Sequence, residues 1–221
     1  NMGVGSGSQP SEYTPFGVDF DDRKSMYEEH LAELRARWTA ASAGEVAAAS
    51  LNVAPLQAPT PPIYVATLSE ETAYRVGVAG DSLLTLLTPD ASDVEGVAAN
   101  IRAHTRGLDE SGATGEAIVM AFAYVGESDA DVRETVAPAL GRLIENSTGA
   151  APPDPEHLYE RMRSNDVGVF GTRDEVHAQL ERFAAHGIGH VAFVSRFGGM
   201  SRDASAESLR RLALLTPPMP K

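Results

Sequence analysis

The sequence predicts an α/β fold in which helices cover a sheet of parallel strands. Short apolar runs alternate with longer helical patterns four times along the chain, and consecutive parallel strands need such crossover helices. One run, 117–125, is apolar almost without interruption, which is typical of a parallel strand covered on both faces. The 221 residues are enough for one sizeable core, so we expect a single domain over 1–221.

Ahead of the first apolar run, a helix is predicted over residues 22–38. The apolar residues of one face recur at steps of four, three and four: Tyr27, Leu31, Leu34 and Trp38. We expect this face to pack on a core, with Asp21 or Asp22 as N-cap. Residues 39–62 are rich in Ala and Pro, which favours a long extended connection.

The first two strand–helix units follow this connection. A strand is predicted at 63–67, and Ser69 is the expected N-cap of the next helix. A second strand is predicted at 82–87, followed by a helix from about Ser92 that ends before a loop at 109–115. The apolar stripe of this second helix consists of Val94, Val97, Ala98 and Ile101.

The third unit joins the strand at 117–125 to a helix capped by Ser128, in which Pro138 is expected to produce a kink. A Pro-rich break at 152–155 then precedes a short helix near 156–164.

Next, Thr172 and Glu175 form the capping-box pattern of a helix that ends at Gly187. The fourth strand is predicted at 190–197, and the last helix at 206–215. Four such units amount to half of the eight units in a (β/α)8 barrel.

Composition narrows the classes of partner and site. The formal charge of −13 repels nucleic-acid phosphates and anionic lipids, so a small molecule or another protein is the expected partner. The absence of cysteine excludes disulfides, thiolate metal sites and a cysteine nucleophile. No apolar run approaches the roughly 20 residues of a membrane span and no secretory signal is evident, so we expect a cytoplasmic protein without membrane contact.

Familiar catalytic motifs are absent from the sequence. It contains no P-loop, no His-Glu-x-x-His and no Gly-x-Ser-x-Gly. His186 and His190 lie four residues apart, but glycines between them break any helix that would place both on one face, so no metal site is predicted. The glycine run at 3–7 lacks the spacing of a dinucleotide fingerprint, and a flexible terminus explains it equally well.

The segment 67–72 is the most informative candidate site. It follows a predicted strand and opens a helix, so free backbone N–H groups and the positive end of the helix dipole could hold a phosphate there. Ser69 and Thr72 add two hydroxyl donors. Ordinary capping by Ser69 explains the same residues, and both interpretations stay open.

An ordered set of short stretches resembles the bacterial luciferase-like monooxygenase family over essentially the whole chain. The stretches are GVGSGSQPSEY at 3–13, FGV at 16–18, PPIYVA at 61–66, GDSLL at 80–84, GTRDEV at 171–176, GIGHV at 187–191 and FGG at 197–199. Ser69 and Thr72 also fall where the family has similar residues.

The resemblance implies a TIM barrel that binds reduced FMN or, in some branches, the deazaflavin F420. Residue by residue, it assigns the flavin phosphate to Ser69 and Thr72, with backbone near Ser8 and Gln9. It implies an enzyme that oxidises a small organic substrate with O2, with a flavin reductase supplying FMNH2. No residue is predicted as catalytic acid or base.

The resemblance also implies a partial barrel. Residues 3–7 correspond to the end of the fourth strand, and the strands from 63, 82, 117 and 190 correspond to the fifth to eighth, so the first strands are lacking. A half-barrel leaves apolar faces and sheet edges uncovered, which predicts a homodimer. The alternatives are a self-associating half-barrel without turnover and an F420-dependent hydride-transfer oxidoreductase.

Overall fold

The computed structural model describes residues 1–45, 51, 53–58, 60–89, 93–152 and 154–215. The chain divides into two compact units, Asn1–Ala66 and Thr67–Lys221, and each is described here by itself. The expectation of a single domain stays a prediction.

The first unit contains two parallel strands, β1 (Met2–Val4) and β2 (Ile63–Ala66). Met2 lies opposite Ile63 and Val4 opposite Val65. The expected strand at 63 is confirmed. The amino-terminal glycine run begins within β1, so it starts as a strand and not as a flexible terminus.

The helices of the first unit differ in part from expectation. A short α1 (Pro10–Tyr13) and 3-10 turns at Thr14–Phe16 and Phe20–Asp22 precede α2 (Arg23–Ser42). Asp22 is the N-cap residue of α2, as expected, but its side chain forms no capping hydrogen bond. The Asp19 carboxylate instead accepts a hydrogen bond from Asp21 N at 2.9 Å, in the turn before the helix.

Helix α2 also continues four residues into the predicted connection 39–62, where alanines favour helix. Residues 46–50, 52 and 59 of that connection lie outside the described residues. The apolar face of α2 is only half-buried, and the single fully buried residue of the helix is Ala41.

The second unit is built around β4 (Ala117–Val125), which is the longest strand. It pairs in parallel with β3 (Ser82–Leu86), β5 (Val169–Gly171) and β6 (Val191–Val194). The parallel pairing confirms the alternation argument. The three-residue β5 was not predicted, because so short a strand is defined by its pairing with β4 and carries no pattern of its own.

The helices described in this unit are α3 (Glu70–Val78), α4 (Glu95–Ser111), α5 (Asp129–Thr148), α6 (Pro155–Ser164), α7 (Arg173–Ala185) and α8 (Arg202–Ala213). Two expected caps are confirmed: the Ser128 hydroxyl accepts from Asp131 N at 3.2 Å, and the Glu175 carboxylate accepts from Thr172 N at 2.8 Å. Helix α5 continues through Pro138.

Two helix boundaries differ from the sequence prediction. Helix α4 runs to Ser111, into the predicted loop 109–115, and the expected start at Ser92 lies outside the described residues. Helix α8 begins four residues earlier than expected, because the Ser201 hydroxyl caps it by accepting from Ala204 N at 3.1 Å.

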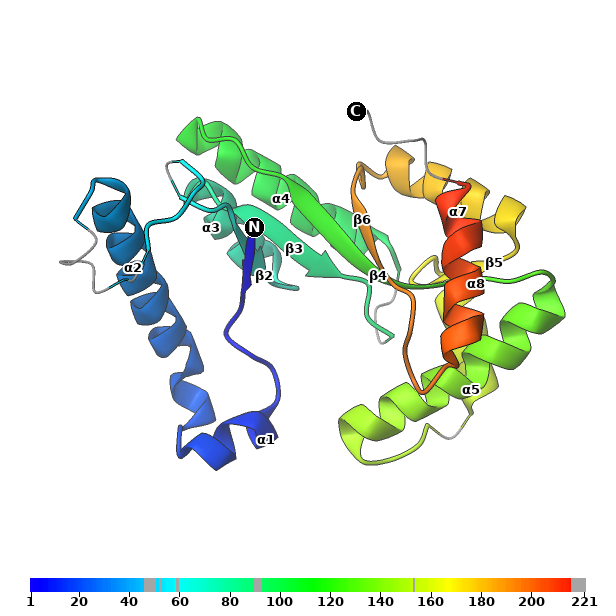
Figure 1. Ribbon diagram of the computed structural model, residues 1–221. Helices are drawn as coiled ribbons and strands as arrows, with labels where there is room; N and C mark the ends of the chain where they lie inside the picture. Colours follow the sequence, from blue (N-terminus) through cyan, green and yellow to red (C-terminus); the bar gives the residue numbers. More distant parts are fainter. Residues whose placement is uncertain (46–50, 52, 59, 90–92, 153, 216–221) are drawn as a thin grey trace. The chain divides into compact units, whose positions relative to one another are not determined.

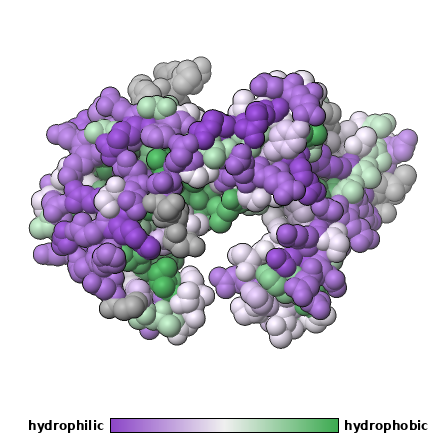
Figure 2. Space-filling model, turned by 180° about the vertical axis from the view of Figure 1, so that it is seen from behind, coloured by the Kyte–Doolittle hydropathy of each residue, from purple (hydrophilic) through white to green (hydrophobic). Residues whose placement is uncertain are grey.

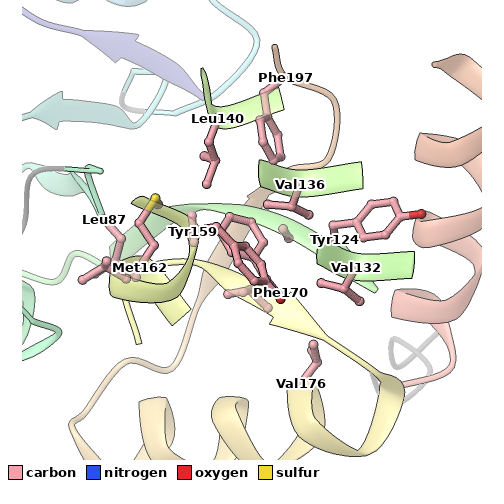
Figure 3. Close-up of a cluster of buried hydrophobic side chains, with 14 of the residues drawn as sticks. Leu87, Tyr124, Val132, Val136, Leu140, Tyr159, Met162, Phe170, Val176 and Phe197 are labelled. Carbon is pink, nitrogen blue, oxygen red and sulfur yellow. The ribbon is translucent and has the colours of Figure 1, made fainter. Parts of the chain in front are cut away.

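The core of the second unit lies between β4 and the helices around it (Figure 3). Val119, Ala121 and Ala123 of β4 are fully buried. Tyr159 of α6 stacks on Phe170 of β5, with ring centroids 6.3 Å apart. Aromatic pairs of this kind add to the burial energy and define one packing arrangement.

The opposite side of the same sheet is less well covered. Side chains alternate along a strand, so the residues between the fully buried ones lie on the other face. The half-buried residues of this face are Leu84, Leu86, Ile118, Met120 and Phe122. In the space-filling view, hydrophilic residues dominate the visible surface and hydrophobic ones gather in separate patches (Figure 2).

Helices α3 and α4 lie next to each other (Figure 1), and glycines bring their backbones into close contact. A Cβ atom built on Gly77 would lie 2.2 Å from His104 O, and one built on Gly107 would lie 2.2 Å from Tyr74 O. Only glycine permits this backbone contact, which orients α3 and therefore its amino-terminal end.

Candidate functional site

The start of α3 is organised by local hydrogen bonds. The Thr67 hydroxyl accepts from Ser69 N at 3.1 Å, and the Ser69 hydroxyl accepts from Thr72 N at 3.3 Å. Ser69 is exposed and Thr72 is half-buried. The capping interpretation of Ser69 is therefore confirmed, and it leaves the hydrogen of the Ser69 hydroxyl available as a donor.

The same helix end retains unused donors. The backbone N–H groups of Glu70 and Glu71 belong to the first helical turn and have no hydrogen-bond partner among the residues that the structure describes. Glu70 Oε1 lies 3.3 Å from Arg106 Nη2 of α4, so its charge is partly offset by a cation. Backbone donors, two hydroxyls and the helix dipole together suit an anion with several oxygen acceptors.

The other two predicted site residues lie in the first unit. Ser8 is exposed, and Gln9 is half-buried at the N-cap position of α1, where its carbonyl accepts from Glu12 N at 3.0 Å. Because they belong to Asn1–Ala66 and Ser69 belongs to Thr67–Lys221, their part in one common site stays a prediction.

The first unit contains a cavity of about 470 Å³, which sequence reasoning missed. Its walls are β1, the two residues after it, Tyr13, and one face of α2 from Arg23 to Leu34. The volume falls within the range of ligand pockets, roughly 300–1,000 Å³. The sequence did contain a signal for a charged group at this cavity, because Arg23 lies four residues before Tyr27 and so extends the predicted apolar face of the helix.

Several charged groups in the second unit form ion pairs that connect helices. Arg163 of α6 contacts Asp129 of α5 and Glu175 of α7, the latter at 2.5 Å. The hydrogen bond from Thr172 N holds the pKa of Glu175 below its usual value, whereas burial raises the pKa of Tyr159. These contacts stabilise the helical layer and do not converge on a free cleft.

The described part of the chain holds no group of three or more His, Asp or Glu side chains placed to bind a metal ion. Nor does any helix within it have the length and apolar character needed to cross a membrane.

Comparison with known proteins identifies the family. The model of the luciferase-like monooxygenase family matches residues 1–190. The chain belongs to this family. The resemblance seen in the sequence is therefore confirmed, and luciferase-like proteins are the proper reference for the fold.

Solved structures agree on the fold. The monooxygenase RslO1 from Streptomyces bottropensis superposes with a TM-score of 0.81 at 18% identity, covering 96% of this chain and 66% of that one. The oxygenating constituent of 3,6-diketocamphane monooxygenase from Pseudomonas putida, in complex with FMN, superposes with a TM-score of 0.72 at 16% identity. The match covers 98% of this chain and 70% of that one. An F420-dependent secondary alcohol dehydrogenase superposes with a TM-score of 0.53 at 19% identity, and the match covers 86% of this chain and 62% of that one. Luciferase-like neighbours thus include both FMN and F420 proteins.

The chain is shorter than its relatives. An uncharacterized protein, y4vJ, of Sinorhizobium fredii is 31% identical over 102 residues, which are 43% of this chain and 29% of that protein. The chain thus spans less than a third of the curated relative that it matches.

Proposed function

We propose that this luciferase-like chain is a flavin-dependent monooxygenase that binds reduced FMN and uses O2 to oxidise a small organic substrate. The observation that carries the proposal is the start of α3, where the N–H groups of Glu70 and Glu71 are unused and Ser69 and Thr72 belong to the same first turn. Family membership and the FMN complex of a neighbour with the same fold support it.

The residues at this helix end fit a phosphate monoester. Ser69 and the N–H groups of Glu70 and Glu71 would donate to its oxygens, and Thr72 would add a second hydroxyl. The hydrogen bond from Ser69 N to Thr67 holds the loop in place before a ligand arrives, which reduces the entropy lost on binding.

Reduced FMN would supply the electrons that activate O2, and the protein would anchor and orient it. A flavin reductase would provide FMNH2 in solution. Within the chain itself, the role of Ser69 and Thr72 is binding; we assign no residue as catalytic acid or base.

The test compares FMN with riboflavin, which lacks the phosphate, by quenching of flavin fluorescence. Ser69→Ala would remove both the phosphate donor and the cap, and loss of a cap costs about 1 kcal/mol of stability. Ser69→Asp is sharper, because aspartate caps as well as serine does but repels phosphate. We expect Ser69→Asp with Thr72→Ala to weaken FMN binding at least tenfold and to leave riboflavin binding unchanged.

The matched control is Thr105→Ala, which removes an exposed hydroxyl from α4 that donates to Ile101 O. Unchanged FMN affinity in the double variant would exclude the phosphate assignment. Tighter binding of F420 than of FMN would instead favour the alternative, an F420-dependent hydride-transfer oxidoreductase.

A second candidate function is association without turnover. It is supported by the half-buried sheet face of the second unit and by β6, whose only strand partner among the described residues is β4. We propose that the chain corresponds to the carboxyl-terminal part of a TIM barrel, and that this apolar surface drives homodimer formation. A monomer at micromolar concentration in light scattering would contradict the homodimer.

A further inference from the structure

The cavity of the first unit has an ordered wall. The Tyr13 hydroxyl donates to Ser6 O, and the Tyr13 ring meets Phe20 edge-on with centroids 5.3 Å apart. Arg23 stacks over Phe20, with Cζ 3.9 Å from the ring centroid, and its Nη1 donates to Phe20 O at 2.9 Å. A chain of contacts therefore fixes the guanidinium at the cavity before any ligand binds.

Gly7 makes this wall possible. Its φ of +72° lies in the left-handed region, and a Cβ atom there would come within 2.6 Å of Tyr13 Oη. Another residue at this position would displace the tyrosine and, through Phe20, the arginine.

The charge of Arg23 is not balanced by a carboxylate. The Arg23 guanidinium has five N–H groups, and one of them donates to Phe20 O. Among the described residues, none forms an ion pair with Arg23. His30 lines the same cavity, and none of the described lining residues is acidic. In a chain with 31 acidic and 18 basic residues, an acid-free lining that contains a cation indicates an anionic ligand.

The rest of the lining is apolar. Met2 and Val4 of β1 face the cavity together with Met26, Leu31 and Leu34 of α2. These α2 side chains are only half-buried, because the cavity lies against them. A ligand with an apolar body would remove this surface from water, which favours binding.

We propose that the cavity between β1 and α2 binds a small apolar monocarboxylate, whose anionic group pairs with Arg23 and whose body packs on Met26, Leu31 and Leu34. A carboxylate matches the planar guanidinium in a bidentate hydrogen bond, which a neutral ligand cannot form. This site lies within the first unit, whereas the phosphate site proposed at the start of α3 belongs to the second unit.

Isothermal titration of the full chain with 4-phenylbutyrate tests the proposal, with the uncharged 4-phenylbutyramide as the reference compound. We expect the carboxylate to bind at least tenfold more tightly than the amide. Arg23→Gln is expected to remove this difference, whereas Lys24→Gln, the same charge change at an adjacent exposed residue outside the lining, should leave it intact. Equal binding of the two compounds, or an unchanged difference in Arg23→Gln, would overturn the proposal.

A second variant guards against misfolding of Arg23→Gln. Met26→Trp adds volume at the cavity while keeping every charge, and it should abolish binding of both compounds with an unaltered circular dichroism spectrum. Binding that persists in this variant would place the ligand elsewhere and contradict the proposal.

Competition with FMN separates this site from the proposed function. FMN should not displace 4-phenylbutyrate, and the Ser69→Asp variant should bind it as the unaltered chain does. Displacement by FMN would show that the cavity belongs to the flavin site and would overturn the inference. Failure of FMN to bind at α3 would affect the proposed function alone.

Discussion

The two faces of the sheet in the second unit have similar apolar residues but very different burial. Leu83 of β3 and Val119 of β4 are fully buried beneath the helices, whereas the neighbouring Leu84 and Met120 on the other face are half-buried. The covered face is built by crossover helices that each strand carries with it in sequence. The second face has no such local cover, so its burial depends on contacts from farther away.

The largest expected effect contrasts two adjacent leucines of β3. Leu83→Ala should lower the free energy of unfolding by about 3 kcal/mol, because it leaves a cavity in a closely packed core. Leu84→Ala should cost about 1 kcal/mol or less, since that side chain already contacts water. Urea unfolding monitored by circular dichroism measures both. Equal losses would mean that the second face is covered in solution, which would remove the contrast.

An intermediate effect concerns the helices that cover the buried face. Gly77→Ala should destabilise the protein by about 2 kcal/mol, because the new methyl group would overlap His104 O of α4 and force the helices apart. Gly96→Ala is the matched control: it lies in α4 with no atom within 4 Å of its Cβ position, and should be neutral or stabilise by about 0.5 kcal/mol. Similar thermal unfolding of both variants would contradict the close approach of α3 and α4.

The smallest effect lies at the start of α7. The lowered pKa of Glu175 means that the folded state favours its ionised form, so its contribution is present at neutral pH and is lost as pH falls through the folded-state pKa. Glu175→Gln should cost about 1 kcal/mol or less at pH 7, since the carboxylate is partly exposed, and the difference should shrink below about pH 4. Urea unfolding of the variant and the unaltered chain between pH 7 and about pH 4 measures this difference in the free energy of unfolding. Glu134→Gln, at an exposed residue of α5 outside the capping box, is the matched control. A pH dependence equal to that of Glu175→Gln in this control would exclude the capping box as the cause.

Local signals were the part of the fold that sequence predicted best. The caps at Ser69 and Ser128 and the Thr172–Glu175 pair were anticipated, because each links residues three apart. The N-cap residue of α2, Asp22, was also anticipated, but its side chain forms no capping bond; the side chain that does, Asp19, caps the turn before the helix.

The candidate sites show the same division. The hydroxyls and backbone of 67–72 could be proposed as a phosphate site from order in the chain alone, since strand, loop and helix are consecutive. The cavity at Arg23 could not be predicted from the sequence, because its walls come from β1, Tyr13 and α2. Only the packing of these segments places an arginine without an acidic partner beside an apolar surface.

Sequence by itself determined the alternation of strands and helices, the parallel sense of the strands, the main helix caps and the luciferase-like family, because these depend on spacing over a few residues or on ordered motifs. Tertiary structure alone decided the strand β5, the glycine contact between α3 and α4, the unequal burial of the two sheet faces and the cavity beside α2. Each of these arises from groups distant in the chain, whose contact energies exist only once the backbone has folded.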